Sequence, residues 1–292
     1  SNPVSASCEI GVKIVTPITG MTFTEDTELN QLGYGQEYQI KYTLEPVDAT
    51  ASLLTWASDN PEVISVDKTG KLKVHTTKTA SAVITASYGP VVQNVTVTVA
   101  DGRFWYSLGN GLGNGLDNNW YLDGNNASVV SSDGNKTTVQ MGSGYRGDLW
   151  LARSGKGKIV NVTPADYRYF AIKVGFKSQL VPGKNKPNGC IKLEIFDDGI
   201  KKIGPEYFGT GGDANNRYEI LGASEISTTE PNVLYYDLQS KYKTVTPTDW
   251  NQVFDLVQCK FVIADFPETA QTYDLYWIRS FKSIEELQAF VD

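Results

Sequence analysis

The sequence has little of the residues that most often carry out chemistry. Its 292 residues include one histidine, two methionines and three cysteines. With a single histidine, His75, Ser-His-Asp and Cys-His mechanisms are excluded unless that residue is itself the base. Cys8, Cys190 and Cys259 cannot all pair and show no ligand spacing. The sequence therefore predicts neither a disulfide framework nor a zinc site.

An excess of basic charge and long apolar runs are missing as well. Lys and Arg number 26 against 33 Asp and Glu, which gives a net charge of −7. Such a chain is not drawn to phosphate, so we expect no nucleic-acid partner and no anionic membrane surface. No run approaches the ~20 apolar residues of a membrane span, and the first residues do not resemble an export signal. Residues 1–10 are interpreted as a tag or linker, so a removed export signal or lipid anchor stays open.

Glycine and aromatic residues are plentiful, with 27 Gly and 16 Tyr. This composition is typical of all-β proteins, and the length favours two domains. Alternation of apolar and polar residues with period 2 at 38–44 and 95–99 predicts half-buried strands. Further short apolar runs separated by turn residues predict a β-sandwich in the first hundred residues.

One segment of this first domain carries a family resemblance. Residues 55–67 read TWASDNPEVISVD, a glycine turn follows at Gly70, and an apolar run spans 82–86. The segment resembles the group 2 bacterial immunoglobulin-like domain, over about residues 11–100. Where that family usually has a glycine before its penultimate strand, this sequence has Thr79, Ala80 and Ser81. The resemblance implies an immunoglobulin-like extracellular spacer or adhesion module, in which Trp56 packs between the sheets.

The second domain is predicted to follow a boundary at 100–103 and to span residues 103–292. Residues 170–176, 191–195 and 257–263 alternate as strands do, which places Cys259 in the core. Ser283 and Glu286 form a capping-box pattern, which predicts a short C-terminal helix that closes one end of the sandwich. The fold expected is a jelly-roll β-sandwich.

Four segments of this domain, 145–150, 169–174, 234–238 and 277–287, resemble a family of uncharacterised extracellular domains of gut Bacteroidetes. That family has the plan of carbohydrate-binding modules. The resemblance implies a fold and a class of protein, and it supplies no catalytic residues.

A glycan site needs flat aromatic rings beside side chains that bind hydroxyl groups. Aromatic residues next to Asn, Asp and Arg in turn-rich sequence meet this requirement. Packing beneath the loops, or a structural Arg146–Asp148 pair, would explain them as well. The candidate ligand-binding residues are Trp105, Asn118, Asn119, Trp120, Tyr121, Tyr145, Arg146, Asp148 and Trp150.

We therefore expect a non-catalytic polysaccharide-binding protein on the cell surface, which captures glycan for a bacterial glycan-utilisation system. It would be a monomeric lipoprotein at the outer-membrane surface of a Gram-negative bacterium, with no cofactor. Two other functions stay open: a β-sandwich glycoside hydrolase and an adhesion or scaffold protein. Its acidic residues (Glu194, Asp197, Asp198 and Glu206) are expected to be solvated charges rather than a catalytic pair. Asp101, Asp148 or Asp274 could hold a structural calcium ion.

Overall fold

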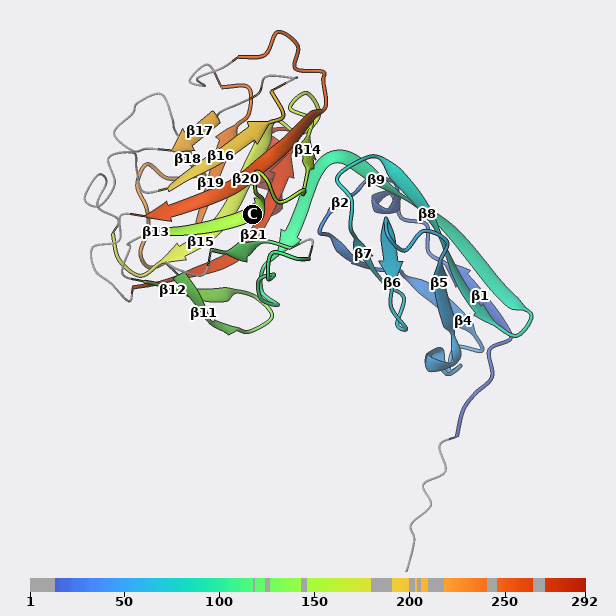
Figure 1. Ribbon diagram of the computed structural model, residues 1–292. Helices are drawn as coiled ribbons and strands as arrows, with labels where there is room; N and C mark the ends of the chain where they lie inside the picture. Colours follow the sequence, from blue (N-terminus) through green and yellow to red (C-terminus); the bar gives the residue numbers. More distant parts are fainter. Residues whose placement is uncertain are drawn as a thin grey trace, which may run out of the picture.

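The computed structural model describes residues 14–117, 119–123, 127–142, 146–179, 191–199, 203, 206–209, 218–240, 246–264 and 271–292. Two β-sandwiches lie side by side and share one long strand (Figure 1). The predicted all-β class, with two sandwiches and a short C-terminal helix, is confirmed. Among the described residues no helix is long and apolar enough to cross a membrane.

The first sandwich contains the strands up to β9 and two short 3-10 helices. Strands β5, β8, β9 and β2 form one sheet, β3, β7 and β6 a second, and β1 pairs with β4. Alternate residues of these strands form the core, among them Leu32, Ile64, Leu72 and Val97. The bounds are β1 Gly20–Phe23, η1 Thr27–Asn30, β2 Leu32–Tyr34, β3 Glu37–Gln39, β4 Tyr42–Glu45, η2 Ala51–Leu53, β5 Thr55–Ser58, β6 Ile64–Val66, β7 Lys71–Val74, β8 Ala80–Tyr88 and β9 Val91–Ser107.

The predicted glycine turn lies directly beneath Trp56. Gly70 has a φ of +82°, and a Cβ there would lie 2.6 Å from the Trp56 ring. Only glycine fits this approach without strain. Trp56 is half-buried and stacks on Phe23 with 5.8 Å between ring centroids. The prediction that Trp56 packs within the sandwich is confirmed.

The second sandwich consists of two facing antiparallel sheets. The first has the order β10-β13-β20-β16-β17, with β14 on β20, and the second has β18-β19-β15-β21-β9, with β12 and β11 beyond β21. The bounds are β10 Tyr121–Leu122, β11 Ala127–Ser132, β12 Thr137–Met141, β13 Arg146–Ala152, β14 Val160–Val162, β15 Tyr169–Phe176, β16 Ile191–Asp197, β17 Glu206–Gly209, β18 Glu219–Ile220, β19 Asn232–Asp237, β20 Phe254–Ala264 and β21 Thr272–Phe281.

Aromatic rings fill the space between these two sheets. Phe170 contacts both Phe104 and Phe261, at 4.9 Å and 5.7 Å between ring centroids. Cys259 is fully buried beside them, as predicted, and burial raises the pKa of its thiol. A buried thiol of this kind is a packing residue rather than a nucleophile.

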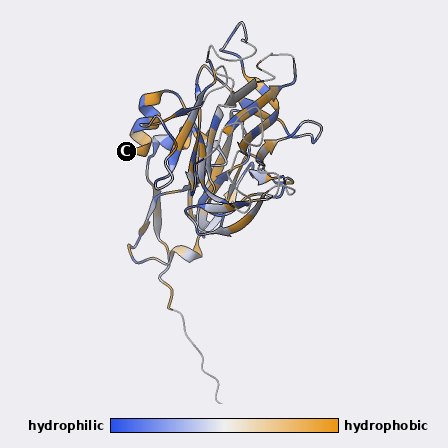
Figure 2. Ribbon diagram, turned by 90° about the vertical axis from the view of Figure 1, so that its left-hand side faces the viewer, coloured by the Kyte–Doolittle hydropathy of each residue, from blue (hydrophilic) through white to orange (hydrophobic). Residues whose placement is uncertain are grey.

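The C-terminal helix α1, Ile284–Val291, begins where the capping pattern predicts. The Ser283 side chain accepts a hydrogen bond from the Glu286 amide at 3.2 Å. Leu287 is buried, and the Phe290 ring packs on Trp105 at 5.3 Å. The helix therefore lies against the outer face of β9 and β21 (Figure 2), and the expectation that it closes one end of the sandwich is wrong. The aromatic outer face of the sheet provides an apolar surface against which the apolar side of the helix is buried.

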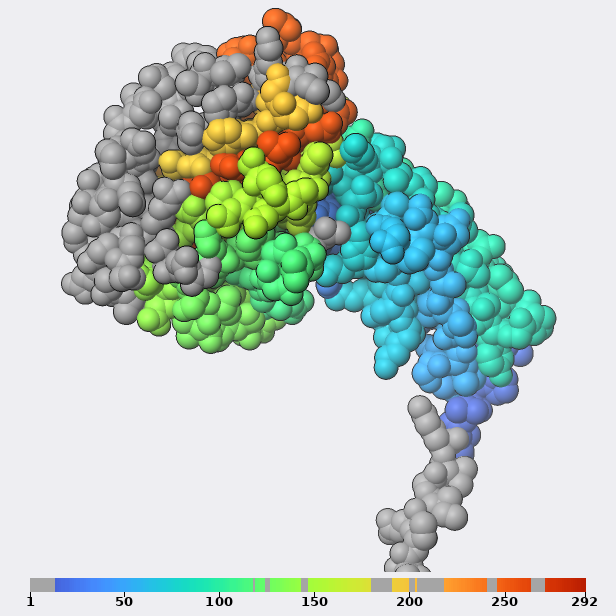
Figure 3. Space-filling model, viewed as in Figure 1, coloured from blue at the N-terminus to red at the C-terminus, as the bar shows by residue number. Residues whose placement is uncertain are grey.

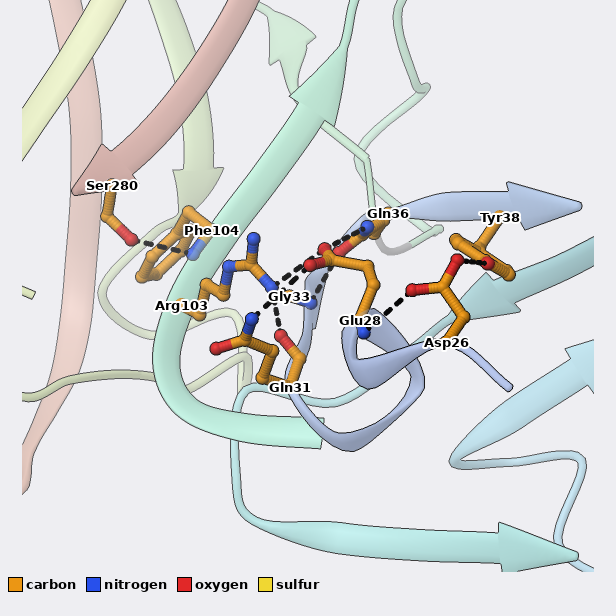
Figure 4. A network of polar contacts seen from close by, with 9 residues as sticks. All are labelled: Asp26, Glu28, Gln31, Gly33, Gln36, Tyr38, Arg103, Phe104 and Ser280. Atoms are coloured by element: carbon orange, nitrogen blue, oxygen red, sulfur yellow. Dashed lines mark hydrogen bonds and ion pairs between the residues drawn. The ribbon is translucent and has the colours of Figure 1, made fainter. Parts of the chain in front are cut away.

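The expected boundary at 100–103 lies inside the continuous strand β9. Arg103, from this part of β9, forms a 3.0 Å ion pair with Glu28 and donates to the Gln31 carbonyl of the first sandwich (Figure 4). The next amide, of Phe104, donates to Ser280 of β21 at 2.9 Å. Arg103 and Phe104 are adjacent in β9, and the first contacts one sandwich while the second contacts the other.

Gly102 lies at a close contact between β9 and the second sandwich. Its φ is +67°, and a Cβ there would lie 2.3 Å from Thr163 Oγ1 and 2.6 Å from the Thr163 amide nitrogen. Nearby, the Thr77 hydroxyl donates to Asn161 at 2.7 Å in a buried contact. No linker separates the two sandwiches at this junction.

We expect Gly102→Ala to lower the free energy of unfolding by about 2–5 kcal/mol, because left-handed backbone strain adds to overpacking. Gly155→Ala is the matched control: its φ is +76°, yet nothing lies within 4 Å of its Cβ position. It should lose only about 1–2 kcal/mol. Denaturant unfolding of both variants checks this, and equal losses would show that the contact with Thr163 contributes nothing.

Candidate functional site

One sheet of the second sandwich presents a continuous row of residues across five of its six strands. In register, Tyr121 lies opposite Trp150, Trp150 opposite Lys260, Lys260 opposite Glu194, and Glu194 opposite Tyr207. Paired residues share a face of a sheet, and their chain neighbours in β13, β20 and β16 are core residues. The described side chains of the row therefore lie on the outer face, and the three central strands β13, β20 and β16 are visible side by side in Figure 3.

The charged residues on this face are buried and paired with one another. Lys260 Nζ lies 2.9 Å from both Asp148 Oδ2 and Glu194 Oε2. Lys192 Nζ lies 2.7 Å from Glu194 Oε1. The side chains of Lys260 and Glu194 are only 7% and 6% exposed. We call this surface the row face, defined by Tyr121, Asp148, Trp150, Lys192, Glu194, Gln258 and Lys260.

Burial of charge on an outer face is unusual, since such side chains are normally solvated. Removing an ammonium or a carboxylate from water costs several kcal/mol unless an opposite charge is held close to it. The ion pairs that offset this cost also fix the side chains in position. The row face is therefore preorganised, with donors and acceptors held in place before any ligand arrives.

Trp150 lies beneath two cations rather than open to solvent. The Lys260 ammonium is 4.3 Å from its ring centroid and the Arg153 guanidinium 5.0 Å. Its side chain is buried and its Nε1 lacks a hydrogen-bond partner. The prediction that Trp150 stacks on a sugar is wrong, because its ring is already covered. Among the described rings of this row, Tyr121, half-buried beside it, is one that solvent reaches.

Three of the candidate ligand-binding residues come together on the row face: Tyr121, Asp148 and Trp150. Arg146 is the first residue of β13, and its side chain is outside the described residues. Asn118 and Tyr145 also lie outside the described residues.

Trp120 is a core residue, and its prediction as a ligand platform is wrong. The side chain is fully buried, and its ring lies 5.5 Å from Phe261 and 6.1 Å from Tyr106. The amide of Gly113 donates to the Trp120 carbonyl at 2.6 Å, which holds the chain around it in place. The Asn119 side-chain oxygen accepts a hydrogen bond from the Trp120 amide at 2.8 Å. Asn119 thus acts locally as a backbone cap.

Trp105 lies on the opposite sheet and does not join Tyr121 and Trp150 on the row face, so its role as a ligand-binding residue stays a prediction. Its ring is 4.5 Å from the Arg103 guanidinium and 4.4 Å from that of Arg279. Phe290 of α1 covers it from a third direction. The ring is therefore occupied by cation–π and aromatic contacts that attach the helix to the sheet.

Three charged residues of the row face, Lys192, Glu194 and Lys260, were not among the ligand-binding residues predicted from the sequence. Glu194 was expected to be a solvated surface charge, and this is wrong because it is buried between two lysines. Asp197 is buried too, and accepts hydrogen bonds from the amides of Gly199 and Ile203. Alternation with Ile191, Leu193 and Ile195 places Lys192 and Glu194 on the outer face, but only the strand register brings Lys260 between the carboxylates.

This arrangement does not match the needs of a glycoside hydrolase. Hydrolysis requires one carboxyl group to be protonated so that it can donate to the leaving oxygen. Asp148 and Glu194 both bind the Lys260 ammonium, and an ion pair needs both partners ionised. The side chain of the fourth acidic candidate, Glu206, lies outside the described residues.

The carboxylates considered for calcium lie in three different strands, β9, β13 and β21, and have other partners. Asp101 accepts from the Thr79 amide at 2.5 Å, and Asp274 pairs with Lys136 at 2.8 Å and Lys177 at 3.0 Å. Within the described ranges, no three histidine, cysteine or acidic side chains gather where a metal ion could be held. A structural calcium ion stays a prediction.

Comparison with known proteins places the chain in one family. No curated protein matches the sequence significantly. A structure described as "Structural basis for the promiscuous specificity of the carbohydrate-binding modules from the beta-sandwich super family" aligns over 90% of this chain and 97% of that one, at 12% identity and a TM-score of 0.29. The CBM51-2 and INT domains of Clostridium perfringens ZmpB align over 88% of this chain and 48% of that one, at 11% identity and a TM-score of 0.22. The model of a domain of unknown function, DUF4979, matches residues 111–287, more than half of the chain, and the chain belongs to that family.

Proposed function

We propose that the chain binds a carbohydrate on the row face without cleaving it. The observation that carries this proposal is the burial and mutual pairing of Lys192, Glu194 and Lys260 on an outward-facing sheet surface. A sugar offers hydroxyl groups at fixed angles around an apolar ring face, so it is recognised by polar groups that are already fixed beside an aromatic ring. The row face combines both features.

The side chains of the row divide into two layers. Tyr121, Asp148 and Gln258 are half-buried, so a ligand can reach them from solvent. Lys260 and Trp150 lie deeper and hold Asp148 in place through the ion pair and the cation–π contact. In this proposal Tyr121 contacts the sugar ring, Asp148 and Gln258 bind hydroxyl groups, and the deeper residues are positioning residues.

The wider role belongs to the same proposal. The chain would capture a polysaccharide outside the cell for a bacterial glycan-utilisation system, as a monomer held at the outer-membrane surface by a lipid anchor. The motif resemblances of both domains support this role. The junction at Gly102 and Arg103 supports it as well, because a rigid first sandwich would hold the row face at a fixed orientation.

Two tyrosine variants test the location of the site. Tyr121→Ala should weaken retention in affinity gels at least about tenfold, as loss of a contact residue worth more than about 1.4 kcal/mol would do. Tyr235→Ala is the matched control, because Tyr235 is a half-buried tyrosine on the outer face of the opposite sheet. The probes are plant, algal, fungal and host polysaccharides. Weaker retention of Tyr235→Ala, with Tyr121→Ala unchanged, would move the site to the other face.

A further inference from the structure

We infer that the row face selects neutral glycans and rejects glycans that carry carboxylate or sulfate groups. This inference rests on the proposed function, since it names the class of ligand for the same site. Its basis is the pairing of charges on the row face and at its β10–β13 edge. Each cation described there lies beside a carboxylate.

The pairs can be followed across the sheet. Lys192 lies 2.7 Å from Glu194, and Lys260 lies 2.9 Å from Asp148. At the β10–β13 edge, Arg153 lies 3.7 Å from Asp123. Three cations thus face three carboxylates among the described side chains. The surface is strongly polar, yet its described charges sum to zero.

An anionic ligand would gain little here. Recognition of a carboxylate or sulfate normally relies on an arginine or lysine that is free to form a direct, often two-pronged, ion pair. Lys260 already contacts two carboxylates, and any added anion near it would also lie near Asp148 and Glu194. The chain as a whole carries −7, so long-range attraction would not compensate.

A neutral sugar carries no charge that the carboxylates of the row face would repel. The carboxylate oxygens can accept further hydrogen bonds from hydroxyl groups while their ion pairs stay intact. Binding of this kind neither adds nor removes charge, so it should depend little on ionic strength.

The test compares neutral and acidic polysaccharides on the full chain. The neutral probes are β-glucan, galactomannan and yeast mannan, and the acidic probes are polygalacturonate, alginate and chondroitin sulfate. We expect retention by a neutral probe, none by the acidic ones, and less than about a twofold change in affinity between about 50 and about 500 mM salt. Retention by acidic probes alone, weakened about tenfold by salt, would overturn the inference and leave carbohydrate binding standing. Retention by no probe would overturn the proposed function itself.

A single variant tests the charge argument directly. Asp123 is partly exposed, so Asp123→Asn should fold normally while it leaves Arg153 without its carboxylate partner. We expect this variant to gain measurable retention by polygalacturonate and to keep its affinity for the neutral probe within about twofold. If polygalacturonate does not retain the Asp123→Asn variant, the inference is contradicted.

Discussion

Replacing Tyr34 by alanine should lower the free energy of unfolding by about 3–5 kcal/mol, the usual cost of removing a buried aromatic ring. Tyr34 belongs to β2 of the first sandwich, yet its side chain lies in the core of the second. Its ring contacts Tyr106 at 5.3 Å and Phe104 at 6.0 Å. Burial raises the pKa of Tyr34 to about 12, as expected for a phenol removed from water. The loss should therefore appear in the unfolding of the second sandwich.

Tyr34→Phe provides the control, because it keeps the ring and removes only the hydroxyl group. It should lower the free energy of unfolding by about 1 kcal/mol, the usual contribution of one hydrogen bond. Tryptophan fluorescence separates the two sandwiches, since Trp56 is in the first while Trp105 and Trp120 are in the second. If Tyr34→Ala shifts only the unfolding of the first sandwich, the two do not share a core. A shift of both shows that the first sandwich is part of the folding unit of the second.

Replacing Lys260 by methionine should lower the free energy of unfolding by about 3–5 kcal/mol and abolish glycan retention. The change removes the Lys260 ammonium from both Asp148 and Glu194. Each carboxylate then loses an ion pair that offsets its desolvation, and the loss of such a contact on a largely buried face is strongly destabilising. Denaturant unfolding and affinity gels on the same protein measure the two effects.

A double variant separates charge from packing. Lys260→Met with Asp148→Asn leaves one neutral pair, Lys192 with Glu194, and should recover most of the lost stability. It should not recover retention, since both the positioning ammonium and the hydroxyl acceptor are gone. If the double variant is as unstable as Lys260→Met alone, the ion pair is not the reason for the loss. If it binds normally, the row face is not the site.

The strands were predictable because alternation is a local property of the chain. It placed Cys259 in the core, the family resemblance implied that Trp56 packs in the first sandwich, and the capping pattern located the start of α1. The presence of aromatic residues next to polar ones brought Tyr121, Asp148 and Trp150 into one candidate set. These residues lie in adjacent strands that pair within a short stretch of sequence.

The rest of the site depends on contacts between distant segments. Lys260 meets Asp148 across 112 positions of sequence, through a strand register that no local pattern fixes. Trp120 follows turn-rich polar sequence, but the chain around it folds over the core and buries the ring. Alternation put Trp105 on the opposite side from Phe104 and Tyr106 without indicating which side faces the core. Packing between the sheets decides which side of a strand is buried.

The most direct test of the central claim is affinity electrophoresis of the intact chain against the polysaccharide panel, with reducing-sugar release measured in the same samples. Binding at the row face without cleavage predicts that one or more neutral polysaccharides retard the protein while no reducing sugar appears. Release of reducing sugar would contradict the claim and indicate a hydrolase. Absence of retardation by every polysaccharide would contradict it too and would favour a scaffold with a protein partner.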